Sequence, residues 1–302
     1  MVILFFRILA IIGIVTTVSL LAIYFKKNKD NEKLQDNLAY GKKHVIYNSI
    51  LALVANFLDV EGIGTHAVNA IGFKMGRSVE DSNIPGTMNV GAAVPCCLAA
   101  FLFYPISRVD GMTIILLIIP AVLGAFTMSG VIGKMNLLGV RLLMGTGLVI
   151  MSIFMFVKGF SLGNVDFEGN SVTLTGGQLA IAMICSLIFG GLMNIGVGYY
   201  APMIAILSML GLDVTSSLTI VFGATSMLLA FGNAPMLIKI GKFDMVTVIT
   251  QLFLGSLGVV AAYMLQKHLP IHIMTIVIAV AVLVTGFSFL KDFAKGQRAV
   301  NR

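Results

Sequence analysis

The chain has 302 residues, of which 58% are hydrophobic and 11% are charged, and its mean hydropathy is +0.99. Since a soluble domain carries roughly 25% charged residues, this composition excludes an ordinary soluble protein. The apolar runs are long and aperiodic, which excludes the short alternating segments of an outer-membrane barrel. We therefore predict an all-α polytopic membrane protein.

The net charge of +7 comes from 20 basic and 13 acidic residues. The basic residues gather mainly in short loops and tails, where they set the orientation of a membrane protein, so nucleic acid is not predicted as a partner. Three cysteines, Cys96, Cys97 and Cys185, lie in apolar segments. Adjacent cysteines can hardly bridge without strain. We interpret them as packing residues, with a thiol relay for a sulfur substrate as the alternative.

The first predicted element is a retained transmembrane helix over residues 2–24, which is long enough to span a bilayer although it contains Arg7. No small-residue cleavage site precedes the lysine-rich segment KKNKDNEKLQDNLAYGKKH, so a cleavable signal peptide is not predicted. Residues 1–43 then comprise this helix and a basic cytoplasmic loop.

Eight apolar segments follow, at about 45–76, 86–104, 112–131, 139–157, 178–211, 216–236, 245–266 and 271–290. The first and fifth of these exceed thirty residues, which is too long for one straight crossing of about twenty. Closely spaced glycines interrupt both near the middle. We predict a helix, a break and a second helix in each.

The two interrupted segments match each other. FLDVEGIGTHA (57–67) aligns with part of GGLMNIGVGYYAP (190–202), which places Gly62 over Gly196 and Gly64 over Gly198. Three apolar segments follow each interrupted segment, so we predict an internal duplication. The expected parts are a first repeat over 44–158 with its hairpin at 44–76, an extracellular link over 159–177, a second repeat over 178–290 with its hairpin at 178–211, and a basic cytoplasmic tail over 291–302.

Charge distinguishes two membrane arrangements, because loops rich in Lys and Arg stay cytoplasmic. If both interrupted segments turn back, sixteen basic residues lie inside and three outside; if both cross, the numbers are fourteen and five. The acidic link GFSLGNVDFEGNSVTLTGG falls outside only in the first arrangement. We therefore favour two re-entrant hairpins in an inverted repeat, with nine full crossings as the alternative. Inverted repeats with interrupted helices are typical of transporters whose substrate site lies near the membrane midplane.

Each break places a helix N-terminus within the membrane, near Thr65 and near Tyr199. The first N–H groups of a helix lack helical partners and carry partial positive charge. Two such ends that meet from opposite sides would form an anion cradle, and glycines let the backbone approach the ligand. Thr65 suits an N-cap and Pro202 suits a first helical turn.

The helix after each hairpin begins with small polar residues, in NIPGTMNVG (83–91) and TSSLTIVFGATSM (215–227). Their side chains either reach the same site or bond only their own helix backbone. The candidate substrate-binding residues are therefore Gly62, Gly64, Thr65, Thr87, Asn89, Gly196, Gly198, Tyr199, Thr225 and Ser226.

Asp59, Glu61 and His66 are unusual because ionisable groups at membrane depth are costly and often functional. Desolvation favours a carboxyl group that carries a proton rather than a charge. Asp59 and Glu61 are thus candidates for proton coupling, with Asp59 preferred. Two other roles remain open: a structural one, in which Asp59 accepts hydrogen bonds from the N–H groups of the break, and cation ligation. We interpret His66 as a packing residue, and neither a metal nor a cofactor is predicted.

The repeated glycine break, followed by an alanine, an apolar arm and a helix that opens with Thr or Ser, resembles the sulfite exporter TauE/SafE family, also called the toluene-sulfonate uptake permeases. NFLDVEGIGTHA with IPGTMNVG after it is especially similar to a Firmicutes-type branch of that family. The resemblance covers residues 44–290. It implies transport of sulfite, sulfoacetate or other sulfonates through the bacterial inner membrane, with the paired glycine motifs on Gly62, Gly64, Gly196 and Gly198. Many members of the family have an unbroken glycine run with apolar residues after it in the first motif, where this chain has Asp59, Glu61 and His66. The helix ends predict an anion, and only the resemblance names it.

We accordingly expect a multi-pass secondary carrier for a small anion, coupled to protons. The alternative is a channel or a cation carrier that uses Asp59 and Glu61. No HExxH motif and no legible Ser-His or Cys-His pairing is present, so an enzyme is not predicted. The expected partners are the anion and the lipid bilayer, and the oligomeric state is left open, with a homodimer among the options.

Overall fold

The computed structural model describes residues 2–60, 64–103, 109–127, 137–159, 171–193, 199–266 and 271–300. These residues form helices and one isolated β-bridge, between Ser171 and Leu212. The helices are α1 (Val2–Asn28), α2 (Glu32–Lys43), α3 (Val45–Val60), α4 (Thr65–Gly76), η1 (Asp81–Asn83), α5 (Ile84–Phe103), α6 (Gly111–Thr127), α8 (Leu137–Gly159), α9 (Gly176–Leu192), α10 (Tyr200–Met209), α11 (Val214–Met227), the π-helix η4 (Leu228–Asn233), α12 (Ala234–Ile240), α13 (Met245–Thr250), the π-helix η5 (Gln251–Gly255), α14 (Ser256–Gln266) and α15 (Ile271–Val300).

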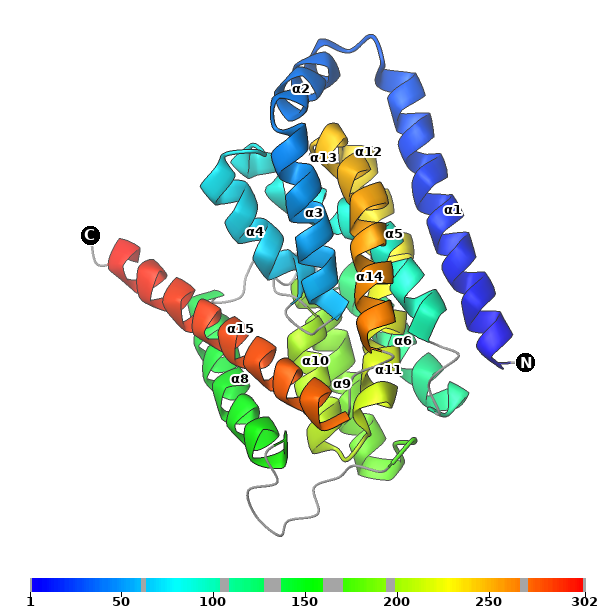
Figure 1. Ribbon diagram of the computed structural model, residues 1–302, viewed down its shortest axis with the longest axis vertical. Coiled ribbons are helices and arrows are strands. Elements are labelled where there is room, and N and C mark those ends of the chain that lie inside the picture. The colour runs from blue at the N-terminus through cyan, green and yellow to red at the C-terminus, as the bar shows by residue number, and fades with distance from the viewer. Residues whose placement is uncertain are drawn as a thin grey trace.

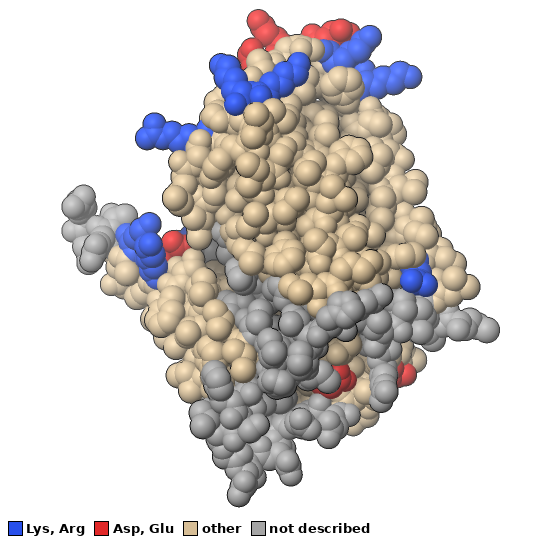
Figure 2. Space-filling model, in the orientation of Figure 1, with Lys and Arg blue, Asp and Glu red and all other residues tan. Residues whose placement is uncertain are grey.

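Within this described part, four continuous helical stretches are long and apolar enough to cross a membrane: Leu4–Asn28, Asp81–Phe103, Thr215–Ile240 and Met245–Leu265. Figure 2 shows that most Lys and Arg side chains on the visible face lie at the end of the molecule that carries α2, above a broad uncharged band. A wide uncharged surface of this kind is stable in lipid and not in water. The chain is therefore a helical membrane protein.

The basic segment that follows the first helix contains a helix of its own, α2, which was not predicted. Asn31 is its N-cap, and the Asn31 side chain accepts a hydrogen bond from the Lys33 N–H at 2.9 Å. The helix buries Leu34 and Gly41 against the rest of the protein. A polar surface helix needs only a narrow apolar stripe to pack against a protein. In this lysine-rich segment the stripe is too small to be recognised from composition.

The first interrupted segment folds back on itself. The Tyr47 hydroxyl, near the start of α3, donates a hydrogen bond to the carbonyl of Gly72, near the end of α4, at 2.9 Å. The Asn48 side chain donates to the carbonyl of Ser78 at 3.5 Å. The start of α3 and the end of α4 therefore lie side by side, in the half of the molecule that carries α2 (Figure 1).

The second interrupted segment also folds back. Ser171, which precedes α9, donates its N–H to the carbonyl of Gly211 and accepts the N–H of Asp213, at 3.3 and 3.1 Å, and both partners follow α10. Gly211 has a φ of +92°, a conformation that favours glycine. Figure 1 shows this hairpin in the half of the molecule opposite to α2.

The core is built around α5, which is buried along most of its length and packs against α1, α11, η4 and η5. Close backbone packing joins α6 to α9, because a Cβ atom on Gly124 would collide with the carbonyl of Leu187 and one on Gly190 with the carbonyl of Ala121. Small residues permit such close approach between membrane helices. α8 and α15 pair with each other along one flank and contact α10 (Figure 1).

Candidate functional site

A cavity of about 420 Å³ lies between the two interrupted segments, and we call it the break cavity. α3 ends at Val60 and α4 begins at Thr65, while α9 ends at Leu192 and α10 begins at Tyr200. Residues on both sides of both breaks contribute to its walls, together with α5, α11 and α15. The lining residues are Asp59, Gly64, Thr65, His66, Ala70, Ile71, Lys74, Met75, Cys96, Met193, Tyr199, Tyr200, Phe222, Thr225, Thr285, Ser288, Phe289, Lys291, Asp292 and Lys295.

The N-terminus of α4 faces this cavity and is already bound by a carboxylate of the same chain. The backbone N–H of Thr65 donates a hydrogen bond to Oδ1 of Asp59 at 2.7 Å. The N-cap position is Gly64, with a φ of +77°, and not Thr65, which is the first helical residue. The structure thus contains the contact that the structural interpretation of Asp59 requires.

Tyr199 is the N-cap residue of α10, and its side chain makes no capping hydrogen bond to that helix. The Tyr199 hydroxyl lies 2.7 Å from the Ser186 hydroxyl, which itself lies 2.6 Å from the carbonyl of Leu117. Because the carbonyl can only accept, Ser186 donates to Leu117 and Tyr199 donates to Ser186. The polar end of Tyr199 is therefore committed to the protein, and its ring forms part of the cavity wall. Pro202 lies in the first turn of α10, as its position in the sequence suggested.

Three lining residues of the cavity carry a buried polar atom for which the described part of the chain shows no hydrogen bond. These atoms are Oγ1 of Thr225, on α11, and Oγ1 of Thr65 and Nε2 of His66, on α4. Buried polar groups are nearly always hydrogen-bonded, and an unpaired one is costly in an apolar setting. These atoms thus retain an unused hydrogen-bonding capacity beside the cavity.

Three of the predicted substrate-binding residues do not line the break cavity, although the Asn89 side chain interacts with that of His66, which does. The Thr87 hydroxyl donates to the carbonyl of Asn83 and accepts the N–H of Asp244, both at 2.8 Å. Asn89 donates to its own helix and accepts a hydrogen bond from the Asn233 side chain at 2.9 Å. The Ser226 hydroxyl bonds the carbonyl of Gly223 at 2.8 Å.

Five of the candidates line the cavity: Asp59, Gly64, Thr65, Tyr199 and Thr225. The remaining candidates, Glu61, Gly62, Gly196 and Gly198, lie outside the described residues.

A polar row on the buried face of α3 was not recognised from the sequence. Asn48, Asn56 and Asp59 share this face, and we call them the α3 polar stripe. The Asn48 side chain donates to Oγ1 of Thr247 on α13 at 2.7 Å. One turn further along the facing helix, both polar atoms of Gln251 are buried without a partner among the described residues, as is Oδ1 of Asn56. The signal was present as polar residues at helical spacing in an apolar segment, but only the fold shows what they face.

The exposed rim of the break cavity is basic. Lys74 on α4 and Lys291 and Lys295 on α15 are exposed, with Asp292 as the acidic member of this group. Such an excess of positive charge attracts small anions toward an opening. The described residues contain no group of three or more His, Cys, Asp or Glu side chains arranged to hold a metal ion.

Comparisons with protein-family models, with curated proteins and with solved structures find no match for this chain. Its function is therefore inferred from the chemistry of the break cavity, where the N-termini of two helices, unpaired polar atoms and a basic rim lie together.

Proposed function

We propose that this protein is a secondary transporter that binds a small anion in the break cavity. The observation that carries the proposal is a single cavity between the two helix breaks. Its rim is basic, and its lining residues include buried polar atoms without a hydrogen-bond partner among the described residues. The rim lysines would concentrate anions, and the Thr225 hydroxyl would donate a hydrogen bond inside the cavity. Such donors bind an anion strongly because the surroundings are partly desolvated.

The two interrupted segments act as re-entrant hairpins in an inverted repeat under this proposal. The 16 residues of α3 measure about 24 Å and the 12 residues of α4 about 18 Å. Both helices are shorter than the hydrocarbon core of about 30 Å. The supporting observation is that both ends of each hairpin meet, and that the hairpins lie in opposite halves of the molecule (Figure 1). The breaks then lie at membrane depth.

Asp59 couples the anion to a proton in this mechanism. Its carboxylate accepts the Thr65 N–H, which is the donor that an anion at the α4 N-terminus would use. An anion and an ionised Asp59 therefore compete for the same site and repel each other. When Asp59 takes up a proton, it becomes neutral and a weaker acceptor, so the N–H is released to the anion. Proton and anion thus bind together.

The α3 polar stripe supports this coupling. It runs along α3 from Asn48, near the charged end of the molecule, to Asp59 at the cavity. Its unpaired polar atoms, with those of Gln251, offer water a place to bind in an otherwise apolar layer. Water bound there would connect Asp59 to the aqueous side.

The class of anion follows from the resemblance described above. Sulfite and sulfonates are small oxyanions with several acceptor oxygens, so one ion can take hydrogen bonds from several donors at once. A cavity of about 420 Å³ is large enough for such an ion with bound water.

A flux panel in proteoliposomes tests the proposal. Purified protein is assayed with sulfite, sulfonates, carboxylates and divalent cations, each with and without an imposed pH gradient. The proposal predicts saturable anion uptake that a pH gradient accelerates, and loss of that acceleration in Asp59→Asn. Ohmic current, or flux of divalent cations that Asp59→Asn abolishes, would instead favour a channel or a cation carrier.

A further inference from the structure

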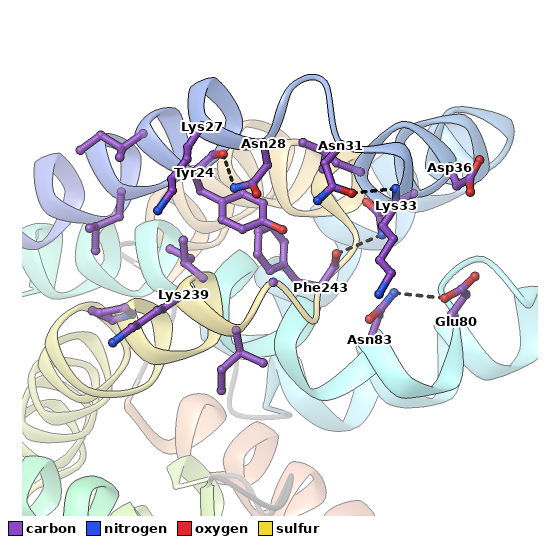
Figure 3. A pocket seen from close by; sticks show the side chains of 18 residues that line it. Tyr24, Lys27, Asn28, Asn31, Lys33, Asp36, Glu80, Asn83, Lys239 and Phe243 are labelled. Carbon is purple, nitrogen blue, oxygen red and sulfur yellow. Dashed lines mark hydrogen bonds between the residues drawn. The ribbon is translucent and has the colours of Figure 1, made fainter.

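A second cavity, of about 810 Å³, lies between the end of α1, the start of α2 and the end of α12 (Figure 3). We call it the α1–α12 groove, and none of its lining residues lines the break cavity. Two of the apolar spans, Leu4–Asn28 and Thr215–Ile240, end beside it. The groove therefore lies at the boundary between the uncharged band and the charged end of the molecule.

On α1 the groove is apolar on the side of the membrane span and cationic one turn further on, and on α12 an exposed isoleucine and a lysine are adjacent. Ile23 on α1 and Ile240 on α12 line it and are 62% and 52% exposed. Lys27 follows Ile23 by four residues on the same face of α1, and Lys239 is the neighbour of Ile240. On α1, hydrocarbon surface is thus followed by positive charge toward the charged end of the molecule, which is the order in which a phospholipid presents its acyl chains and its phosphate.

The charges within the groove are segregated. Figure 3 shows Lys27 and Lys239 on the side formed by α1 and α12, whereas Asp36 and Glu80 lie on the other side, beyond Lys33. Glu80 accepts a hydrogen bond from the Asn83 side chain at 3.3 Å. The part of the groove that opens toward the membrane spans is therefore the basic part.

We propose that the α1–α12 groove binds an anionic phospholipid, with its phosphate between Lys27 and Lys239 and its acyl chain against Ile23 and Ile240. Basic pockets between membrane helices at the interface are suited to acidic headgroups. An anionic lipid fits better than a zwitterionic one, because lysines outnumber acids in the groove and Lys26 and Lys242 add positive charge beside it. A free phosphate would leave the exposed isoleucines uncovered. This site is independent of the proposed transport function, and requires only that the chain is embedded in a membrane.

Lipid retention measured by native mass spectrometry tests the proposal. The full chain is reconstituted with phosphatidylglycerol and phosphatidylcholine, extracted, and scored for bound lipid. The variant Lys27→Gln/Lys239→Gln removes the two groove cations. The matched control Lys26→Gln/Lys242→Gln removes the same charge from neighbouring exposed residues that do not line the groove. We expect the wild type to retain phosphatidylglycerol, the groove pair to bind it roughly 30-fold more weakly, at about fivefold per lysine, and the control pair to change by less than about threefold.

Thermal unfolding in detergent provides the second readout and verifies that both pairs fold. Added phosphatidylglycerol should raise the unfolding midpoint of the wild type and of the control pair, but not that of the groove pair. Three results would overturn the proposal: equal losses in the two pairs, equal retention of the two lipids, or displacement of phosphatidylglycerol by millimolar inorganic phosphate.

Discussion

At the scale of single residues, the break in the first hairpin depends on Gly64 and Asp59. The φ of +77° at Gly64 lies in a region that L side chains rarely adopt, and a Cβ atom there would meet no atom within 4 Å. The chain can therefore turn there and leave open space in the cavity. Asp59 reaches across the break to the first N–H of α4, so one residue of α3 orders the start of the next helix.

The pKa of Asp244, at the charged end of the molecule, makes the stability of the protein depend on pH. It is the N-cap of α13, where its side chain accepts the N–H of Thr247 at 2.7 Å. Burial raises the pKa of Asp244, and the negative charge of Glu80 adds to the rise, while the hydrogen bonds from Thr247 and the charge of His44 oppose it. The unfolded pKa is about 3.9, so the folded state binds the proton more tightly than the unfolded state.

The sign of the pH dependence follows. Stability from this group is present below about pH 4 and is lost as pH rises through the raised folded pKa. Asp244→Asn retains a good N-cap and has no proton to lose. We therefore predict that Asp244→Asn flattens the fall in unfolding midpoint between pH 4 and neutrality, measured by thermal unfolding in detergent. Equal slopes for the wild type and the variant would contradict this.

At the scale of elements, the interrupted helices could be predicted because their length conflicts with the thickness of a bilayer. The segments 45–76 and 178–211 are too long for one crossing, and the structure has α3 and α4 in the first and α9 and α10 in the second. The two π-helices could not be predicted, since a π-helix depends on how the neighbouring helices pack. The same is true of the α3 polar stripe, whose partners come from a helix about two hundred residues away.

Gln251 tests the role assigned to the α3 polar stripe. Its polar atoms are buried and unpaired within the described part of the chain, so Gln251→Leu should leave the unfolding midpoint unchanged or raised, because removal of unpaired polar groups relieves a desolvation cost. Flux driven by a pH gradient should fall several-fold. Thr250→Val is the control, since the Thr250 hydroxyl bonds its own helix. Undiminished coupling in Gln251→Leu would refute a role for the stripe in proton access.

At the scale of the whole molecule, composition was enough to predict a helical membrane protein, because no soluble surface can be built from so few charges. The rotation of each helix about its axis was not available from the sequence. Thr87 and Asn89 lie near the start of α5, whereas Ser226 lies in the last turn of α11 and not at a helix start as predicted. The side chains of all three bond their own helices or other parts of the core. Thr225, the neighbour of Ser226, faces the break cavity instead.

The hairpin arrangement makes a prediction about topology. Lys33 and Glu80 line the same groove, whereas Thr175 precedes α9 in the opposite half of the molecule (Figure 1). Single cysteines at positions 33 and 80, in a background without native cysteines, should react with a membrane-impermeant maleimide from the same side. A cysteine at position 175 should react only from the other side. Labelling of positions 33 and 80 from opposite sides would show that the first interrupted segment crosses the membrane.

The most direct test of the central claim compares two threonines of α11 by sulfite uptake into proteoliposomes. Thr225 lines the break cavity with an unpaired hydroxyl, whereas the buried Thr219 hydroxyl bonds the carbonyl of Thr215 at 2.9 Å and does not line the cavity. Loss of one buried hydrogen bond to a charged ligand costs about tenfold or more in affinity. We predict that Thr225→Val raises the KM for sulfite about tenfold while Thr219→Val changes it less than about twofold. A wild-type KM in Thr225→Val, or equal effects of the two substitutions, would contradict an anion site between the two helix breaks.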